Sequence, residues 1–312
     1  MQRENTYCRF NEKKIGRLEV NRMKAELIFD SQLTLGEGPV WNVDQETLHC
    51  VDIKEKRLYT FNPKEGTHNF IQLDDYVGAV ALREKEGWVA ALKDGFYFID
   101  KQAETIEKIA APDNEPTDNR FNDGKCDPAG RFLAGTLSLA DKEQAASFYS
   151  LDPNGSVERL LENVTLSNGL AWNADGNILY YIDTPTQKVD AFDYDLETGH
   201  LSNRRTVIEI SGEEGSPDGM TIDGEGKLWI AHYGGWQVTR WDPDTGKKLD
   251  SIELPAANVT CCTFGGPDMD ELYITTGRDG LSDADLADQP SAGGIFRVKL
   301  DVKGFPPYRY KG

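Results

Sequence analysis

The 312-residue sequence has no long apolar run. No stretch approaches the roughly 18 consecutive apolar residues that a membrane-spanning helix needs, which excludes an integral membrane protein. Basic residues are also scarce: 34 Lys and Arg stand against 53 Asp and Glu, and the formal net charge is −19. Because a field of this sign repels polyphosphates and anionic lipid and attracts cations, we expect neither nucleic acid nor a membrane surface as a partner.

Cysteine is rare as well. Five cysteines are an odd, scattered number in a chain of this length: Cys8, Cys50, Cys126, Cys261 and Cys262. This pattern favours reduced thiols and a cytoplasmic location over a disulfide framework. The polar first residues have neither the apolar run nor the small-residue cleavage site of a secretory signal. We therefore expect a cytoplasmic protein with a disordered extension over residues 1–23 and one folded domain over residues 24–312.

Several catalytic patterns are absent from the sequence. It has no Gly-x-Ser-x-Gly motif, and the adjacent Cys261 and Cys262 lack CxxC spacing. The four histidines form no HExxH pair. One of them, His232, follows an expected strand and could approach a site, but we interpret a lone histidine as structural.

A repeat is the most informative feature that is present. Short β-type segments follow polar turns and begin at Leu48, Trp88, Phe132, Leu179, Leu228 and Leu272. Their intervals of 40, 44, 47, 49 and 44 residues match the length of a four-stranded propeller blade. A second strand follows in each unit, and no window keeps a persuasive helical period.

The repeat therefore predicts an all-β protein, a six-bladed β-propeller with almost no helix. We expect the early strand at Leu27 to Phe29 to close the ring by pairing with the last blade, because two sheet edges would otherwise stay open. The alternative is a pair of unrelated β domains.

Equivalent positions of a propeller converge on its central channel. Counting back ten or eleven residues from each segment reaches Glu37, Gly78, Asn122, Asn168, Asp218 and Cys262. Four of these six carry a side-chain oxygen, and a buried cluster of two carboxylates and two amides needs a counter-ion. Oxygen ligands favour Ca²⁺, Mg²⁺ or Mn²⁺, although Zn²⁺ also accepts carboxylates. The alternative is that these residues only form local turns.

Four motifs carry a resemblance to a known family. The runs LGEGPVW at 35–41, NRFNDGK at 119–125, SNGLAW at 167–172 and PDGM at 217–220 are similar to signatures of the senescence marker protein, regucalcin and gluconolactonase family. The resemblance extends from about Ala25 to the C-terminus. It implies a six-bladed propeller with one divalent metal ion at the mouth of the channel, calcium first and zinc, magnesium or manganese as alternatives. It also implies a metal-dependent lactonase whose small-molecule partner is a sugar lactone such as glucono-1,5-lactone.

The resemblance also suggests residue roles. Glu37, Asn168 and Asp218 resemble the metal ligands, whereas Arg120 and Asn122 resemble the residues that contact substrate hydroxyls. One stretch departs from the family: the relatives closest to regucalcin have an acidic pair after Ala-Gly-Thr-Met-Ala, but residues 134–141 read AGTLSLAD. The carboxylate is thus missing or displaced to Asp141.

Lactone hydrolysis needs a polarised carbonyl, an activated water and a stabilised oxyanion. We expect the ion to supply the first and third, with Asp218 as both ligand and general base. Arg120 and Asn122 would then fix the sugar hydroxyls. Two other functions stay open: a regucalcin-like calcium-binding protein or propeller scaffold without turnover, and a hydrolase of aryl esters or phosphotriesters with an apolar pocket. The sequence leaves the oligomeric state open.

Overall fold

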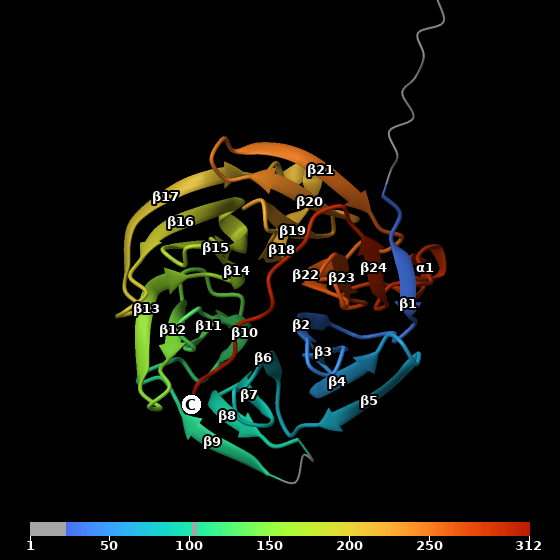
Figure 1. The fold of residues 1–312 in the computed structure, drawn as a ribbon. Helices are drawn as coiled ribbons and strands as arrows, with labels where there is room; N and C mark the ends of the chain where they lie inside the picture. Colours follow the sequence, from blue (N-terminus) through green and yellow to red (C-terminus); the bar gives the residue numbers. More distant parts are fainter. Residues whose placement is uncertain (1–22, 102–104) are drawn as a thin grey trace, which may run out of the picture.

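Six antiparallel sheets of four strands each surround a central channel in the computed structural model, which describes residues 23–101 and 105–312 (Figure 1). In five sheets, four consecutive strands pair in chain order. This arrangement confirms the predicted six-bladed β-propeller. The disordered extension predicted for residues 1–23 lies, apart from Met23, outside the described residues.

Each blade runs from an inner strand at the channel to an outer strand at the rim. Blade 1 contains β2 (Gly36–Asn42), β3 (Thr47–Asp52), β4 (Arg57–Asn62) and β5 (Thr67–Gln72). Blade 2 contains β6 (Val77–Leu82), β7 (Trp88–Leu92), β8 (Gly95–Ile99) and β9 (Ile106–Ala110). Blade 3 contains β10 (Asn119–Cys126), β11 (Phe132–Ser138), β12 (Ala146–Leu151) and β13 (Val157–Val164).

The other three blades follow the same plan. Blade 4 contains β14 (Ser167–Trp172), β15 (Ile178–Asp183), β16 (Lys188–Tyr194) and β17 (Leu201–Glu209). Blade 5 contains β18 (Ser216–Ile222), β19 (Leu228–Tyr233), β20 (Gln237–Asp242) and β21 (Lys247–Glu253). Blade 6 contains β22 (Val259–Gly265), β23 (Glu271–Thr276), β24 (Ile295–Lys299) and β1 (Glu26–Phe29). The six segments predicted from the repeat are thus the second strands of the blades.

Burial decreases from the channel to the rim. Every residue of β6 is buried, whereas most residues of the outer strands β5 and β21 are exposed. The apolar core therefore lies between neighbouring blades, where aromatic side chains bridge the sheets. Trp41 of blade 1 stacks on Tyr273 of blade 6 with 5.1 Å between ring centroids, and Phe148 of blade 3 lies 4.8 Å from Tyr181 of blade 4. Such pairs add about 0.5–1.5 kcal/mol beyond the apolar area that they bury.

The N-terminal strand closes the ring. β1 pairs antiparallel with β24, placing Leu27 opposite Phe296 and Phe29 opposite Ile295. One blade thereby combines the first strand with the last three, and the edge of β24 is covered. This pairing confirms the closure predicted for Leu27 to Phe29.

Helix is scarce, as predicted. Over the described residues, the structure contains α1 (Asp283–Asp288) and the 3-10 turns η1 (Thr184–Thr186) and η2 (Gly212–Glu214). None of the described helices is long and apolar enough to cross a membrane. The four cysteines in the described part of the chain are buried free thiols; the cytoplasmic location stays a prediction.

The C-terminal segment, residues 301–312, crosses the centre of the ring (Figure 1). On one side, the carbonyl oxygen of Lys303 accepts a 2.6 Å hydrogen bond from the amide of Gly224 in blade 5. On the other side, the amide of Tyr310 donates to the carbonyl oxygen of Leu82 in blade 2 over 2.9 Å. The segment therefore joins opposite sides of the ring and covers one end of the channel.

Candidate functional site

A local irregularity marks every inner strand. The register against the second strand shifts once in each blade, as expected of a β-bulge, which bends a strand and re-aims its side chains. The shifts fall between Glu37 and Val40, Val77 and Ala79, Phe121 and Gly124, Asn168 and Leu170, Pro217 and Met220, and Val259 and Cys261. Five of the six positions reached by counting back lie at these irregularities.

The sixth position needs a correction. Counting back from Leu272 reaches Cys262, but the irregularity in β22 precedes Cys261, so Thr260 takes the corresponding place. The Thr260 hydroxyl donates to the carbonyl oxygen of Gly36 over 2.5 Å and therefore ties blade 6 to blade 1. Cys262 is buried in the core cluster between blades, where its thiol lies 3.4 Å from the carbonyl oxygen of Trp229.

All inner strands run in the same direction along the channel, because four antiparallel strands return the chain to its starting end. Glu37, Asn122, Asn168 and Asp218 lie in the first half or the middle of their strands and are all at least nine-tenths buried. The topology therefore brings them toward one mouth of the channel, the end opposite the C-terminal segment. Arg120 precedes Asn122 on β10 and is buried to the same degree.

Hydrogen bonds connect the predicted site residues across three blades. Arg120 Nη1 donates to Asn122 Oδ1 over 2.9 Å, and Asn122 Nδ2 donates to Asn168 Oδ1 over 3.0 Å. Asn168 Nδ2 in turn donates to Thr184 Oγ1 over 2.8 Å, and that hydroxyl donates to the carbonyl oxygen of Pro217 over 2.8 Å. This chain of contacts runs from the arginine of blade 3 to the backbone of blade 5, where it ends at the residue before Asp218.

The carboxyl groups at the site are buried close to one another. Burial, and next the charge of Asp123, raises the pKa of Glu37 to about 8. Burial and the charges of Glu37 and Asp123 raise the pKa of Asp218 well above its usual range. Arg120 partly offsets this repulsion, since its charge acts to lower the pKa of both Glu37 and Asp218. A cation among these groups would favour their ionised forms.

Two residues of the cluster have no role in the sequence-based prediction. Asp123 is 4 % exposed, and its Oδ2 has no hydrogen-bond partner among the described residues. Lys125 Nζ donates to the carbonyl oxygens of Leu170 (2.9 Å) and Met220 (2.8 Å), which places its charge between blades 4 and 5. Both residues belong to the motif at 119–125, but the motif does not indicate which of its side chains turn toward the channel.

The surroundings of His232 are those of a structural histidine. His232 is fully buried, its Nε2 lies 2.6 Å from Thr239 Oγ1, and burial lowers its pKa to about 4. These contacts support the structural interpretation of His232.

Asp141 is exposed in the turn after β11. The carboxylate at the end of β11 is instead that of Glu115, which accepts hydrogen bonds from Thr136 Oγ1 (2.6 Å), Asn119 Nδ2 (2.7 Å) and the Tyr149 hydroxyl.

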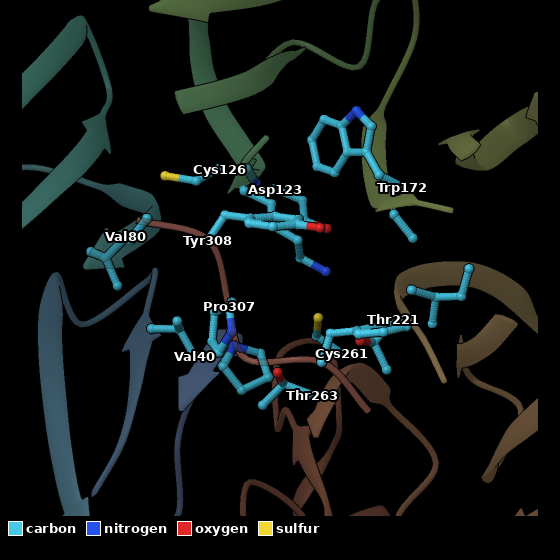
Figure 2. Close-up of a pocket in the computed structure, with 18 of the residues that line it drawn as sticks. Val40, Val80, Asp123, Cys126, Trp172, Thr221, Cys261, Thr263, Pro307 and Tyr308 are labelled. Atoms are coloured by element: carbon cyan, nitrogen blue, oxygen red, sulfur yellow. Dashed lines mark hydrogen bonds between the residues drawn. The ribbon is translucent and has the colours of Figure 1, made fainter. Parts of the chain in front are cut away.

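The other end of the channel contains a cavity of about 80 Å³. Its walls come from the later residues of the inner strands and from the C-terminal segment; Figure 2 shows Tyr308 next to Asp123, and Pro307 next to Val40. Asp123 therefore lies between this cavity and the carboxyl groups of the mouth. The cavity is large enough for a few water molecules but not for a sugar.

Comparison with protein families gives a match over most of the chain. Residues 35–278 match the model of the SMP-30/gluconolactonase/LRE-like region. The chain belongs to this family. The membership confirms the resemblance carried by the four motifs, all of which lie inside the matched residues.

Curated and solved members of the SMP-30/gluconolactonase/LRE-like family cover nearly the whole chain. Regucalcin of Bos taurus is 44 % identical over 300 residues, which are 94 % of this chain and 100 % of the relative. A protein of Bacillus subtilis, provisionally named a sugar lactone lactonase, is 40 % identical over 290 residues, with 93 % and 99 % covered. The crystal structure of a calcium-binding protein, regucalcin, from Agrobacterium tumefaciens superposes with a TM-score of 0.89 at 27 % identity, covering 93 % and 98 % of the chains.

The donor set of this family member suits a hard divalent ion. Glu37 and Asp218 supply carboxylates and Asn168 an amide oxygen, and burial of two like charges is unfavourable without a cation. Among residues 23–101 and 105–312, no three His, Cys, Asp or Glu side chains form a group able to hold an ion by themselves. A site here would therefore depend on Asn168 as the third ligand. The ligand roles, and the substrate roles of Arg120 and Asn122, stay predictions.

Proposed function

We propose that this protein is a divalent-metal-dependent hydrolase that opens sugar lactones such as glucono-1,5-lactone. The observation that carries the proposal is the buried set of Glu37, Asn168 and Asp218 oxygen atoms at one mouth of the channel, with Arg120 bonded through Asn122 to Asn168. The name of the Bacillus subtilis relative, a provisional sugar lactone lactonase at 40 % identity, points to the same substrate class.

Glu37, Asn168 and Asp218 are the residues that would hold the ion. Calcium is our first choice because the three side chains offer oxygen atoms alone, and zinc, magnesium and manganese are alternatives. When bound, a divalent ion supplies Lewis-acid polarisation of a carbonyl and stabilises negative charge on its oxygen. The calcium-binding description of the Agrobacterium tumefaciens relative supports this choice of metal.

Asp218 would act as the general base. Its carboxylate takes a proton from a water molecule while the water oxygen attacks the lactone carbonyl carbon. When the tetrahedral intermediate breaks down, the ring C–O bond cleaves, and the departing oxygen takes the proton back from Asp218. The product is the open-chain hydroxy acid, and the carboxylate is restored for the next turnover.

Arg120 and Asn122 would bind the substrate hydroxyls. Arg120 Nη1 is already used by the carbonyl oxygen of Phe121 (2.8 Å) and by Asn122 Oδ1 (2.9 Å). These two bonds hold the guanidinium plane in one orientation, so its other N–H groups can donate to hydroxyls from a fixed position. Asn122 also orients Arg120 through Oδ1 and Asn168 through Nδ2.

A regucalcin-like calcium-binding protein without turnover is the second candidate, favoured by the description of the Agrobacterium tumefaciens relative. One experiment separates the two. The protein is stripped of metal with a chelator, and hydrolysis of glucono-1,5-lactone is measured with Ca²⁺, Zn²⁺, Mg²⁺ or Mn²⁺ added back separately; calcium binding is followed by calorimetry.

We expect turnover above the spontaneous rate only with an added ion. Calcium binding without turnover under any ion would favour the second candidate, and turnover that survives complete metal removal would overturn the role of the metal.

A further inference from the structure

Asp279 occupies the mouth end of blade 6, just after β23. Its backbone is held from neighbouring blades: its amide donates to the carbonyl oxygen of Thr34 over 2.8 Å, and its carbonyl oxygen accepts from the Tyr233 hydroxyl and from Asn258 Nδ2, each over 3.0 Å. Asn258 is 4 % exposed and also donates to the Tyr233 hydroxyl over 3.2 Å. These three backbone contacts, one of them from the buried Asn258, hold Asp279 in place.

The Asp279 carboxylate has only a weak partner of its own. Its Oδ2 lies 3.4 Å from Lys54 Nζ, and the two side chains are 37 % and 40 % exposed. An ion pair of this exposure contributes about 0–1 kcal/mol. The carboxylate oxygens can therefore exchange this contact for a hydrogen bond to a ligand at little cost.

Asp279 lies at the same end of the channel as the predicted site, because its amide is bonded to Thr34, three residues before Glu37. Its charge raises the pKa of Arg120, against the burial that lowers this pKa to about 10. It also raises the pKa of the Tyr233 phenol, on which the charges of Asp218 and Glu37 act as well. An arginine of blade 3 and a carboxylate of blade 6 thus approach the mouth from different sides.

We propose that Asp279 is a specificity-determining residue that accepts hydrogen bonds from substrate hydroxyl groups, on the side of the mouth away from Arg120. A sugar hydroxyl is both a donor and an acceptor, but arginine can only donate. A polyhydroxylated lactone therefore needs an acceptor for its O–H groups as well, and a hydroxyl left without one on binding costs about 1–3 kcal/mol. Asp279 supplies this acceptor.

The inference rests on the proposed function and names its substrate class: lactones that carry several free hydroxyls. Asp279→Asn tests it with two substrates, glucono-1,5-lactone and δ-valerolactone, a six-membered lactone without hydroxyls. The asparagine keeps the size of the side chain and all backbone contacts. We expect KM for glucono-1,5-lactone to rise about tenfold, the equivalent of about 1.4 kcal/mol, and kcat/KM for δ-valerolactone to stay within about twofold of the wild type.

Two control variants isolate the effect. Asp270→Asn makes the same change in the same blade on the opposite face, where Asp270 Oδ1 lies 2.6 Å from Lys299 Nζ; we expect it to change neither substrate. Lys54→Met removes the ion pair but keeps Asp279, and we expect no rise in KM for glucono-1,5-lactone. If Lys54→Met reproduces the effect of Asp279→Asn, the ion pair explains that effect and the inference is wrong.

The remaining outcomes distinguish a failure of the inference about Asp279 from a failure of the proposed function on which it rests. Wild-type protein that hydrolyses neither lactone overturns the proposed function and the inference with it. Wild-type protein that hydrolyses both, with Asp279→Asn altering both equally or neither, overturns the inference alone. If Asp279→Asn does not fold, Asp279→Glu replaces it: the acceptor remains but is displaced by one methylene, so a KM rise confined to glucono-1,5-lactone supports the inference, and its absence contradicts it.

Discussion

Asn122 and Asn168 stand 46 residues apart in the chain, yet Asn122 Nδ2 donates a 3.0 Å hydrogen bond to Asn168 Oδ1 across the boundary between blades 3 and 4. The same Asn122 side chain accepts from Arg120 Nη1. One amide therefore orients both a predicted substrate-binding residue and a predicted metal ligand. Contacts of this kind around a metal ligand commonly contribute 10- to 100-fold to metal affinity.

Asn122→Ala should therefore weaken calcium binding about tenfold without removing any predicted ligand. It should also raise KM for glucono-1,5-lactone, because the Arg120 guanidinium loses one of the two acceptors that fix Nη1. Calorimetric titration with Ca²⁺ and steady-state kinetics measure the two effects. Asn69→Ala, in the exposed outer strand β5, is the control and should change neither. Unchanged calcium affinity in Asn122→Ala would contradict a ligand role for Asn168.

Removing the side chain of Asp218 and removing that of Arg120 should change different kinetic constants. Asp218→Ala deletes both a predicted ligand and the predicted base, so kcat should fall by at least about 100-fold, the lower end of the usual contribution of a general base. Arg120→Ala should chiefly raise KM, since the guanidinium contacts hydroxyls and not the reacting carbonyl. Michaelis–Menten analysis of both variants, at saturating Ca²⁺, distinguishes the two roles. Near-normal kcat in Asp218→Ala would exclude it as the base.

Much of the fold could be predicted from the sequence because a propeller repeats one unit. The spacing of turn residues and short apolar strands located the second strand of every blade. The exposed edge of the last blade required a partner, which identified the strand at Leu27 to Phe29. The count to the inner strands worked in five blades, since the distance between the first two strands varies little.

The count failed at Cys262 because the bulge in β22 lies one or two residues earlier, relative to the second strand, than in the other blades. The wider site was harder to predict for a similar reason. Tyr233 ends β19, Asn258 precedes β22 and Asp279 follows β23, and no motif joins them; only the packing of blades 5 and 6 brings them together. Such contacts depend on loop geometry, which side-chain type and spacing do not determine.

The metal-free protein should lose stability as the pH rises from about 6.5 to 8. In the folded protein the pKa of Glu37 is about 8, whereas its usual value, which applies to the unfolded chain, is 4.5. The protonated Glu37 side chain therefore contributes fully to stability below pH 4.5, and this contribution is lost as the pH rises through 8. The buried His49 and His232, whose pKa values are both lowered to about 4, have the opposite effect: they make the stability rise as the pH increases toward 6.5. The window above 6.5 therefore isolates the carboxyl groups, whose effect should be on the order of a few kcal/mol.

Urea denaturation at several pH values measures this loss. Saturating Ca²⁺ should abolish it, because the ion favours the ionised carboxylates, and calcium affinity should itself increase over the same window. Glu37→Gln should reduce the pH dependence of the metal-free protein, whereas Glu143→Gln, at an exposed position, should leave it intact. A stability that stays flat from pH 6.5 to 8 without metal would show that Glu37 is already ionised in the folded state.

Gly78 is the position in blade 2 where no side chain reaches the channel. A Cβ there would lie 2.5 Å from the carbonyl oxygen of Phe121 and closer still to the carbonyl oxygen of Asn122. Both are backbone atoms, which cannot rotate away as the end of a side chain can. Gly78→Ala should therefore push β10 away from β6 and move Asn122 from its partner on β14. We expect a stability loss of about 1–3 kcal/mol and weaker calcium binding.

The matched control is Gly212→Ala, because a Cβ at Gly212 meets no atom within 4 Å. Denaturation and calcium titration of both variants give a direct comparison. If Gly78→Ala lowers the stability but not the calcium affinity, β10 shifts without disturbing the predicted ligands. Loss of both would show that the fit between blades 2 and 3 holds the amide of Asn122 in place, since the substitution touches no side chain of the site.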